Sequence, residues 1–451
     1  MVNRGGGAGT DVSGVRAPLQ SEIAATLAWL AERDVARRPE VEWRTRLLLL
    51  DTVAFVVAGL GEPEPRALAD RLGRLESSRA GWPGADITMP ATSAAFVGAL
   101  AACWHEACEG LARAHGRPGL HAVPVAVALG QALGATVGDT LDSIVWGYEI
   151  GARSGEAMRI RPGLHVDGSW GVFAAVGAAS RMFGLSPEAS FQALAVAAGQ
   201  MPVSQIAPII DGVTARNTFA ARACANGIMI AAAAAAGVTG TARSFGLAAD
   251  ALAAGGMALG PWAPPGEFLI LQGYLKSFAA ARHVHYGALC AIECRSAQRT
   301  DTSSIVGLEL AVYPEAAQYC ANRAPTTPMQ AQFSLTHGLA FALRTGALGP
   351  EAYADAVFAD AEQRRLEALA RVVADPSIEG RGARLTVTTV AGSYTYRVNV
   401  APGDVARPMT DAEVTAKAQA YLAPRVGAAR ASVIVDQILK APRDHRFNFF
   451  R

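Results

Sequence analysis

The chain has 451 residues, with 40 Lys and Arg against 39 Asp and Glu and a formal net charge of +1. At roughly 100–200 residues per domain, this length predicts two or three domains with a large core. The balanced charge is not typical of a nucleic-acid-binding protein. Hydrophobic residues make up 51% of the chain but aromatic residues only 7%. The apolar content is therefore mainly Ala, Val and Leu, which suits close-packed helices.

We expect a soluble, cytoplasmic protein without a membrane partner. The longest apolar segments, residues 47–60 and 227–238, are shorter than the ~20 residues that a membrane-spanning helix needs. Residues 1–16 are rich in Gly and lack the apolar core of a signal peptide, so we expect a disordered tail. The six cysteines form no CxxC pair, which is typical of a reducing compartment rather than of a disulfide scaffold.

The sequence from residue 17 to residue 268 is helical in pattern, because apolar residues recur at every third or fourth position. We expect helices at residues 21–34, 43–60, 65–76, 93–104, 124–133, 140–158, 170–183, 187–198, 218–237 and 246–254. Ser21 is placed to cap the first of them. Several helices are rich in Ala on every face, which indicates central helices packed at short distance.

A different pattern begins at about residue 269. Residues 305–313 alternate as a strand does, and residues 384–390 and 394–400 indicate a β-hairpin. Helices are expected beside them at residues 286–294, 331–345 and 350–374. Residues 269–402 are therefore predicted to form a smaller α+β domain.

The helical pattern returns near the C-terminus. Thr410 and Glu413 form a capping box that opens a helix to residue 422, and another helix is expected at residues 431–439. We therefore predict a mainly α protein. Its large helical domain is built from both chain ends, residues 17–268 and 403–451, and the α+β domain is inserted between them.

The common cofactor and nucleophile motifs are missing. There is no P-loop and no GxGxxG between a strand and a helix, so we predict no nucleotide cofactor. The segment from His105 to Glu109 resembles a zinc-protease motif, but glutamate stands where the second histidine is needed, and we predict no metal. GxSxG is also absent, which argues against an α/β-hydrolase. We expect no cofactor.

Polar residues gather in four segments of this otherwise apolar sequence: residues 103–124, 159–171, 212–221 and 271–285. The candidate catalytic residues are His165, Lys276, Glu106 and His115. The candidate substrate-binding residues are Arg117, Arg216, Glu109, Arg282 and His285. Each has a structural alternative, because these segments can be ordinary solvated loops, a lone histidine is often structural, and Arg282 can be a surface residue.

This set of residue types suits the removal of a proton next to a carboxylate. The base must be a carboxylate or an imidazole, and the developing negative charge needs fixed cations or hydrogen-bond donors. A substrate with two or three carboxylates would bind arginine forks and a lysine, which Arg117, Arg216 and Lys276 offer.

The sequence resembles the MmgE/PrpD family over nearly its whole length, from residues 48–54 to residues 409–413. The most specific motifs are GYE at residues 147–149, LHVDGSWG at residues 164–171 and LQGYLK at residues 271–276. Members of this family include 2-methylcitrate dehydratase, cis-aconitate decarboxylase and iminodisuccinate epimerase. The resemblance implies a large helical domain, an inserted α+β lid and a homodimer.

The resemblance also implies roles for single residues. It places the family's loop histidine on His165, its lid lysine on Lys276 and the following histidine on His285. Its acidic residues fall on Glu106 and Glu109.

Three positions depart from the common family pattern. Gly110 stands where threonine is frequent in the family, and Arg117 stands in place of the histidine of a His-Pro pair. Arg216 and Asn217 stand before the helix near residue 220, where family members often have a lysine. Arginine cannot act as an acid near neutral pH, so a proton-transfer role at Arg117 would pass to His115 or to another group. Both arginines strengthen the expectation of an anionic substrate.

Our leading hypothesis is a cofactor-independent lyase, a dehydratase that acts on a hydroxylated di- or tricarboxylate. His165 or Glu106 would take the proton α to a carboxylate, and a protonated imidazole would help hydroxide leave. Alternatives are a decarboxylase, an epimerase or isomerase of a similar polyacid, or an inactive family member that binds a partner. We expect a small anionic polycarboxylate as the ligand, with no nucleic acid.

Overall fold

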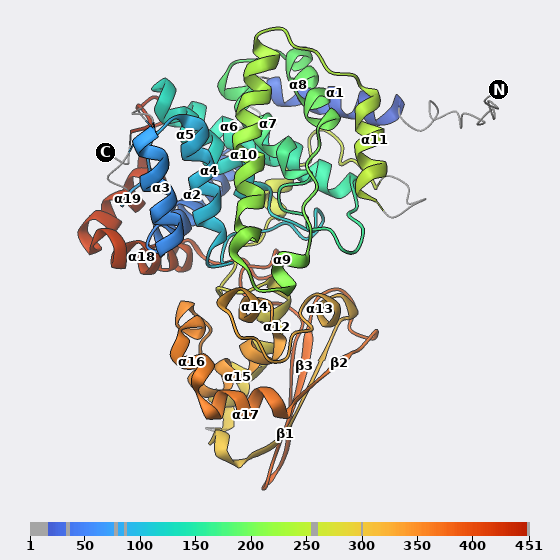
Figure 1. Cartoon of the computed structure of the whole chain (residues 1–451), viewed down its shortest axis with the longest axis vertical. Helices are drawn as coiled ribbons and strands as arrows, with labels where there is room; N and C mark the ends of the chain where they lie inside the picture. Colours follow the sequence, from blue (N-terminus) through green and yellow to red (C-terminus); the bar gives the residue numbers. More distant parts are fainter. Residues whose placement is uncertain are drawn as a thin grey trace, which may run out of the picture.

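The computed structural model describes residues 17–32, 37–75, 80–84, 88–253, 260–298 and 301–448. The predicted tail, residues 1–16, lies outside the described residues. The N-terminal half is helical, as predicted (Figure 1). Its helices are α1 (Ala17–Ala31), α2 (Pro39–Gly59), α3 (Pro63–Leu75), α4 (Ala91–Cys103), α5 (Pro118–Leu133), α6 (Val137–Ala157), α7 (Gly171–Met182), α8 (Pro187–Gly199), α9 (Ala207–Ile210), α10 (Thr218–Ala235) and α11 (Arg243–Leu252).

Small residues let the central helices approach closely. Helix α6 starts from a capping box, in which the Asp139 N–H donates to Thr136 Oγ1 at 3.0 Å. It then packs along α7, where a side chain on Gly151 would clash with Ala174. The predicted role of these small residues in packing is therefore confirmed.

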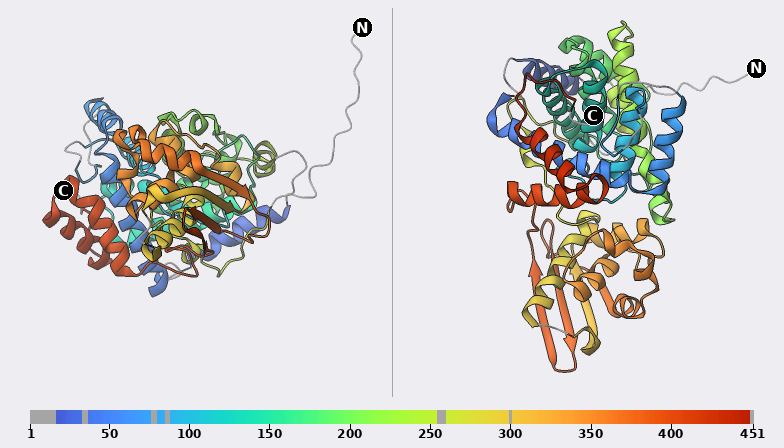
Figure 2. Two further views of the ribbon diagram at one scale, coloured as in Figure 1. Left: turned by 90° about the horizontal axis from the view of Figure 1, so that it is seen from below. Right: turned by 90° about the vertical axis from the view of Figure 1, so that its left-hand side faces the viewer.

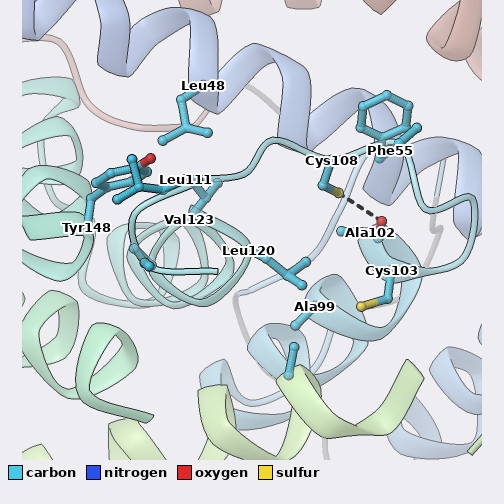
Figure 3. Packing of buried hydrophobic residues seen from close by; sticks show 14 of the residues in the cluster. Leu48, Phe55, Ala99, Ala102, Cys103, Cys108, Leu111, Leu120, Val123 and Tyr148 are labelled. Atoms are coloured by element: carbon cyan, nitrogen blue, oxygen red, sulfur yellow. Dashed lines mark hydrogen bonds between the residues drawn. The ribbon is translucent and has the colours of Figure 1, made fainter. Parts of the chain in front are cut away.

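The apolar core continues to the edge of the polar segment 104–117. Figure 3 shows Leu48 and Phe55 of α2 among the buried residues of this cluster, together with Ala99 and Cys103 of α4. The Cys108 thiol donates a hydrogen bond to the Ala102 carbonyl at 2.9 Å and fixes the chain where α4 ends. The segment that follows α4 is thus anchored on a rigid core.

Two predicted helix starts were wrong. Ser21 lies inside α1, which begins at Ala17, so it is not the cap. Helix α5 begins at Pro118 rather than at Pro124. Proline fits the first helical position, where its missing N–H costs nothing. Pro124 does remove one helical bond, and the carbonyl this leaves, on Leu120, faces the Cys224 thiol at 4.0 Å.

The C-terminal region contains a small mixed sheet in the order β2-β1-β3-β4. Its strands are β1 (Ile305–Val312), β2 (Ala370–Ala374), β3 (Ala383–Thr389) and β4 (Gly392–Val398). Strand β1 runs parallel to β2 and antiparallel to β3. The helices of this region are α12 (Arg282–Gln298), α13 (Pro314–Tyr319), α14 (Pro328–Gln332), α15 (Leu335–Thr345), α16 (Asp355–Ala359) and α17 (Ala361–Leu369).

The helix expected at residues 350–374 was wrong. Its first part is a short 3-10 helix followed by α16 and α17, and its last five residues form β2. The sequence Ala-Arg-Val-Val-Ala of β2 pairs with Leu308–Val312 of β1. Pairing with a distant strand therefore overrides the local helical pattern.

The last two helices return to the N-terminal half. Helix α18 (Asp411–Val426) and helix α19 (Ala428–Lys440) both contact α2 (Figure 2). The predicted capping box at Thr410 and Glu413 is confirmed, with the Glu413 N–H donating to Thr410 Oγ1 at 3.2 Å. The protein is mainly helical with a four-stranded mixed sheet. The boundaries of the domains stay a prediction.

One described segment, Thr214–Ala235, is long and apolar enough to cross a membrane by length and composition. The sequence analysis did not identify it as a candidate. Half of its apolar window is buried, and α10 packs against α4 and α7. A core helix of a folded domain has the same properties.

Candidate active site

Glu106 is the centre of a buried cluster of charges. It lies after the end of α4 with a φ of 51°, a left-handed backbone that is unusual for a glutamate. Its carboxylate accepts hydrogen bonds from Arg216 Nη2 at 2.6 Å, from Lys276 Nζ at 2.7 Å and from Arg117 Nη1 at 3.2 Å. Three predicted site residues, from three of the four polar segments, therefore meet at one carboxylate.

Asp167 is a second carboxylate in this cluster. It pairs with Arg117 Nη2, and Arg216 Nη2 lies 3.3 Å from Asp167 Oδ2. His165 is next to it, with Nδ1 3.8 Å from Asp167 Oδ2. The sequence analysis gave Asp167 no role, although an acid two residues after a candidate histidine is a signal that could have found it. We refer to Glu106, Arg117, His165, Asp167, Arg216 and Lys276 as the Glu106 cluster.

Buried hydrogen bonds fix the loop that carries Arg117 and the loop that carries His165 and Asp167. The Gly168 N–H donates to His121 Nε2 at 3.1 Å, so His121 Nδ1 carries the proton and donates to the Arg117 carbonyl at 3.0 Å. The His165 N–H donates to the Ser204 carbonyl at 2.8 Å. Gly168 has a φ of 78°, and a side chain there would clash with the carbonyl of Phe219.

The cations determine the charge of both carboxylates. Burial alone would raise the pKa of Glu106, but Arg117, Arg216 and Lys276 outweigh it and hold that pKa well below its usual range. The pKa of Asp167 is likewise held low, chiefly by Arg117 against the effect of burial. Both carboxylates are therefore ionised at neutral pH, although Glu106 is only 4% exposed and Asp167 only 1%.

His165 is neutral at the same pH. Burial lowers its pKa to about 4, against the opposing charge of Asp167. The Asp167 N–H donates to His165 Nδ1 at 3.1 Å, so the proton of the neutral ring is on Nε2. The cluster thus holds three cations, two carboxylates and one neutral imidazole, and it keeps one positive charge.

The cluster lies where the helical part meets the C-terminal α+β part. Gln332 Nε2 of α14 donates to the Trp104 carbonyl at 3.0 Å. Gln330 of the same helix donates to the Ile210 carbonyl at 3.1 Å. The Arg216 guanidinium lies 5.5 Å from the centre of the Phe333 ring. The α+β part therefore covers the charged cluster directly.

Comparison with known protein families identifies both halves of the chain. Residues 22–250 match the MmgE/PrpD N-terminal domain, and residues 278–441 match the MmgE/PrpD C-terminal domain. The chain belongs to the MmgE/PrpD family. This family includes 2-methylcitrate dehydratase and related enzymes. A search of curated proteins found no match.

Three predicted site residues of this MmgE/PrpD protein lie outside the cluster. Arg282 pairs with Asp404 and donates through Nη1 to His285 Nδ1 at 3.0 Å. His285 is fully buried, and its other ring nitrogen lies 3.2 Å from the Ala280 carbonyl. Glu109 accepts a hydrogen bond from the Gly119 N–H at 2.6 Å, and burial raises its pKa to about 7. None of the three forms a hydrogen bond or ion pair with the cluster among the described residues.

His115 is a fourth predicted site residue outside the cluster, and it lies between the helical part and the α+β part. It is exposed, its Nε2 accepts from Arg159 at 2.7 Å, and its Nδ1 lies 3.7 Å from Glu315 of α13. Sequence reasoning missed Glu315, because it lies in a short helix without a recognisable motif. In the described chain, no group of three or more His, Cys, Asp or Glu side chains is arranged to hold a metal ion.

The family departure at Gly110 has a structural reason. Gly110 pairs with Tyr274, whose N–H donates to the Gly110 carbonyl at 2.7 Å. Any side chain at position 110 would clash with the Tyr274 hydroxyl. The glycine therefore makes room for the tyrosine ring, which lies beside the segment that carries Lys276.

Proposed function

We propose that this protein is a cofactor-independent lyase that removes water from a hydroxylated di- or tricarboxylate. The observation that carries this proposal is the unbalanced charge of the Glu106 cluster. Buried charges are normally paired one to one, whereas here three cations share two carboxylates. An incoming carboxylate would complete the balance and accept the charge-assisted hydrogen bonds that Arg117, Arg216 and Lys276 offer.

The α+β part acts as a lid in this proposal. Glu106, Arg216 and Lys276 are buried under it, so a substrate reaches them only when the two parts separate. The contacts between the parts include the bonds of Gln330 and Gln332, the Phe333 ring contact and the His115–Glu315 pair, which such a motion would have to break.

Glu106 is the base in the mechanism that we propose. When a substrate carboxylate takes over Arg117 and Arg216, Glu106 loses the charges that keep its pKa low, and it becomes basic enough to accept the proton α to that carboxylate. The cations stabilise the enolate-like charge that forms. The electron pair of this enolate-like intermediate then forms the carbon–carbon double bond as the carbon–oxygen bond to the hydroxyl group breaks.

His165 assists the leaving group in this scheme. Its Nε2–H is free of the backbone contact that occupies Nδ1, so it can donate a hydrogen bond to the departing oxygen. Glu106 returns its proton to hydroxide, and water leaves. This differs from the expected protonated imidazole, because a pKa of about 4 keeps His165 neutral. Arg282 and His285 position the lid rather than bind substrate, since Arg282 pairs with a carboxylate of its own, Asp404, and both ring nitrogens of His285 have partners.

A decarboxylase is the second candidate, because the same cations would stabilise the carbanion left by carbon dioxide. Proton NMR of the purified protein with a panel of hydroxylated di- and tricarboxylates in deuterated water separates the two. We expect a new alkene signal with loss of water and no release of carbon dioxide. Solvent deuterium at an intact stereocentre would indicate an epimerase, and no reaction with any acid would contradict the proposal.

A further inference from the structure

Arg381 is a half-buried arginine that forms no ion pair with a described carboxylate, although its charge helps to lower the pKa of Glu315. It lies in the connection between β2 and β3, and its guanidinium carbon is 5.5 Å from the centre of the Tyr274 ring. The hydroxyl groups of Tyr313 and Tyr286 are also close enough to raise the pKa of Arg381 against the effect of burial. Its Nη1 atom is buried without a hydrogen-bond partner among the described residues.

Arg216 and Arg282 also have a buried Nε without a hydrogen-bond partner, but each of them forms an ion pair. Arg282, on the same tyrosine ring at 4.9 Å, pairs with Asp404, and Arg216 pairs with Glu106. No ion pair joins Arg381 to a carboxylate in the part of the chain that the structure describes. A guanidinium nitrogen that has lost water without gaining a hydrogen-bond partner is unfavourable, and such a buried donor in a folded protein calls for an explanation. An anionic ligand would provide it.

Arg381 is also near the candidate active site. Burial, together with the charges of Arg381 and Lys276, lowers the pKa of His283 to about 4. The tyrosine under Arg381 is two residues before Lys276 and pairs with Gly110, four residues after Glu106. Arg381 therefore faces the same region as Lys276, from the side of the lid.

We propose that Arg381 binds a second carboxylate of the substrate, remote from the reacting carbon. This inference rests on the proposed function. Arg117, Arg216 and Lys276 would hold the carboxylate next to the reacting carbon, and the Arg381 fork would hold the distal one through charge-assisted hydrogen bonds. Because Arg381 belongs to the lid, this contact would couple closure to the presence of a polyacid and select against monoacids.

The test uses tricarballylate, which has three carboxylates and no hydroxyl group to eliminate. We expect Arg381→Gln to weaken its binding about 10-fold to 100-fold in calorimetry, and Arg381→Lys to keep part of the affinity. Arg384→Gln is the matched control, because Arg384 lies three residues further on and pairs with Asp375 at 2.9 Å. Propionate, a monoacid, should bind equally to the wild type and to Arg381→Gln.

Thermal unfolding separates a ligand-binding arginine from a structural one. Without ligand, Arg381→Gln should melt at the same temperature as the wild type or higher, because it removes a charge that forms no ion pair. A lower melting temperature, or unchanged tricarballylate binding, would overturn the inference, as would a wild type that does not bind tricarballylate. If binding depends on Arg381 but no hydroxylated acid reacts, the inference stands and the proposed function fails.

Discussion

Two buried ionic groups of this protein differ in how their charges are balanced. Glu149 and Arg153, both on α6, form a one-to-one pair that is fully buried. The remaining carboxylate bonds go to the N–H groups of Leu269 and Ile270, at 3.0 and 2.9 Å. Arg153 also donates to four backbone carbonyls, including that of Ala263 at 2.9 Å. In the Glu106 cluster, by contrast, three cations share two carboxylates.

The comparison shows that burial alone does not distinguish a structural ion pair from a binding site. The Glu149 pair has its own partners and joins α6 to the segment before Lys276. The Glu106 cluster has a surplus charge and an imidazole with a free N–H. We expect substitutions in the first to change stability and substitutions in the second to change activity.

The largest effect is expected for Glu106→Gln. The amide cannot accept the substrate proton, so kcat in the NMR assay should fall by a factor of about 100 to 10,000. Circular dichroism should show an unchanged helical fold. Glu188→Gln is the control, because Glu188 is exposed on α8. Full activity of Glu106→Gln would exclude Glu106 as the base.

The next effect is a loss of stability in Glu149→Gln. This change leaves the buried Arg153 charge unpaired, which costs about 3–5 kcal/mol of unfolding free energy in urea titrations. Adding Arg153→Met should recover part of the loss. Activity per folded molecule should stay near the wild-type value, and a selective loss of activity would break the comparison.

Lys417→Met is expected to have an intermediate effect. Lys417 Nζ pairs with Asp51 Oδ1 at 2.7 Å and donates to the backbone carbonyl of Lys276, so it holds Lys276 in place. We expect an approximately tenfold fall in kcat from misplacement. The double variant with Asp51→Asn should regain stability, because no charge is left unpaired, but not activity. Recovery of both would show that Lys417 is only structural.

The smallest effect concerns the pH dependence of stability at Glu109. Burial raises its pKa from 4.5 to about 7, so the folded protein binds this proton more tightly than the unfolded chain does. The resulting stabilisation is complete below about pH 4.5 and is lost as the pH rises through 7. The free energy of unfolding should therefore fall by about 1–3 kcal/mol between pH 5 and pH 8, and Glu109→Gln should remove this fall. An unchanged pH dependence in urea titrations would assign it to other groups.

Sequence patterns predicted most of the helices, because a buried helix imposes its period on the chain. They failed at β2, whose partner β1 lies about sixty residues earlier. The four polar segments were predicted, and Glu106, Arg117, Arg216 and Lys276 do meet. Their roles, like the predicted homodimer and cytoplasmic location, stay predictions.

The sequence analysis missed two residues. Asp167 follows the candidate His165 by two residues, but its pairing with two arginines of other segments is visible only in the fold. Arg381 lies between two strands without a motif, and its missing partner is visible only in three dimensions. Charge balance is a property of the folded site, and the sequence reports only the net charge of the whole chain.

The contact between Gly110 and Tyr274 restricts which side chains position 110 can carry. A threonine there would clash with the tyrosine hydroxyl, so the ring would have to move or be replaced by a smaller side chain. The ring in turn lies against both Arg282 and Arg381. A change at position 110 would therefore reach both arginines, and we expect the effects of substitutions at these four positions to be interdependent.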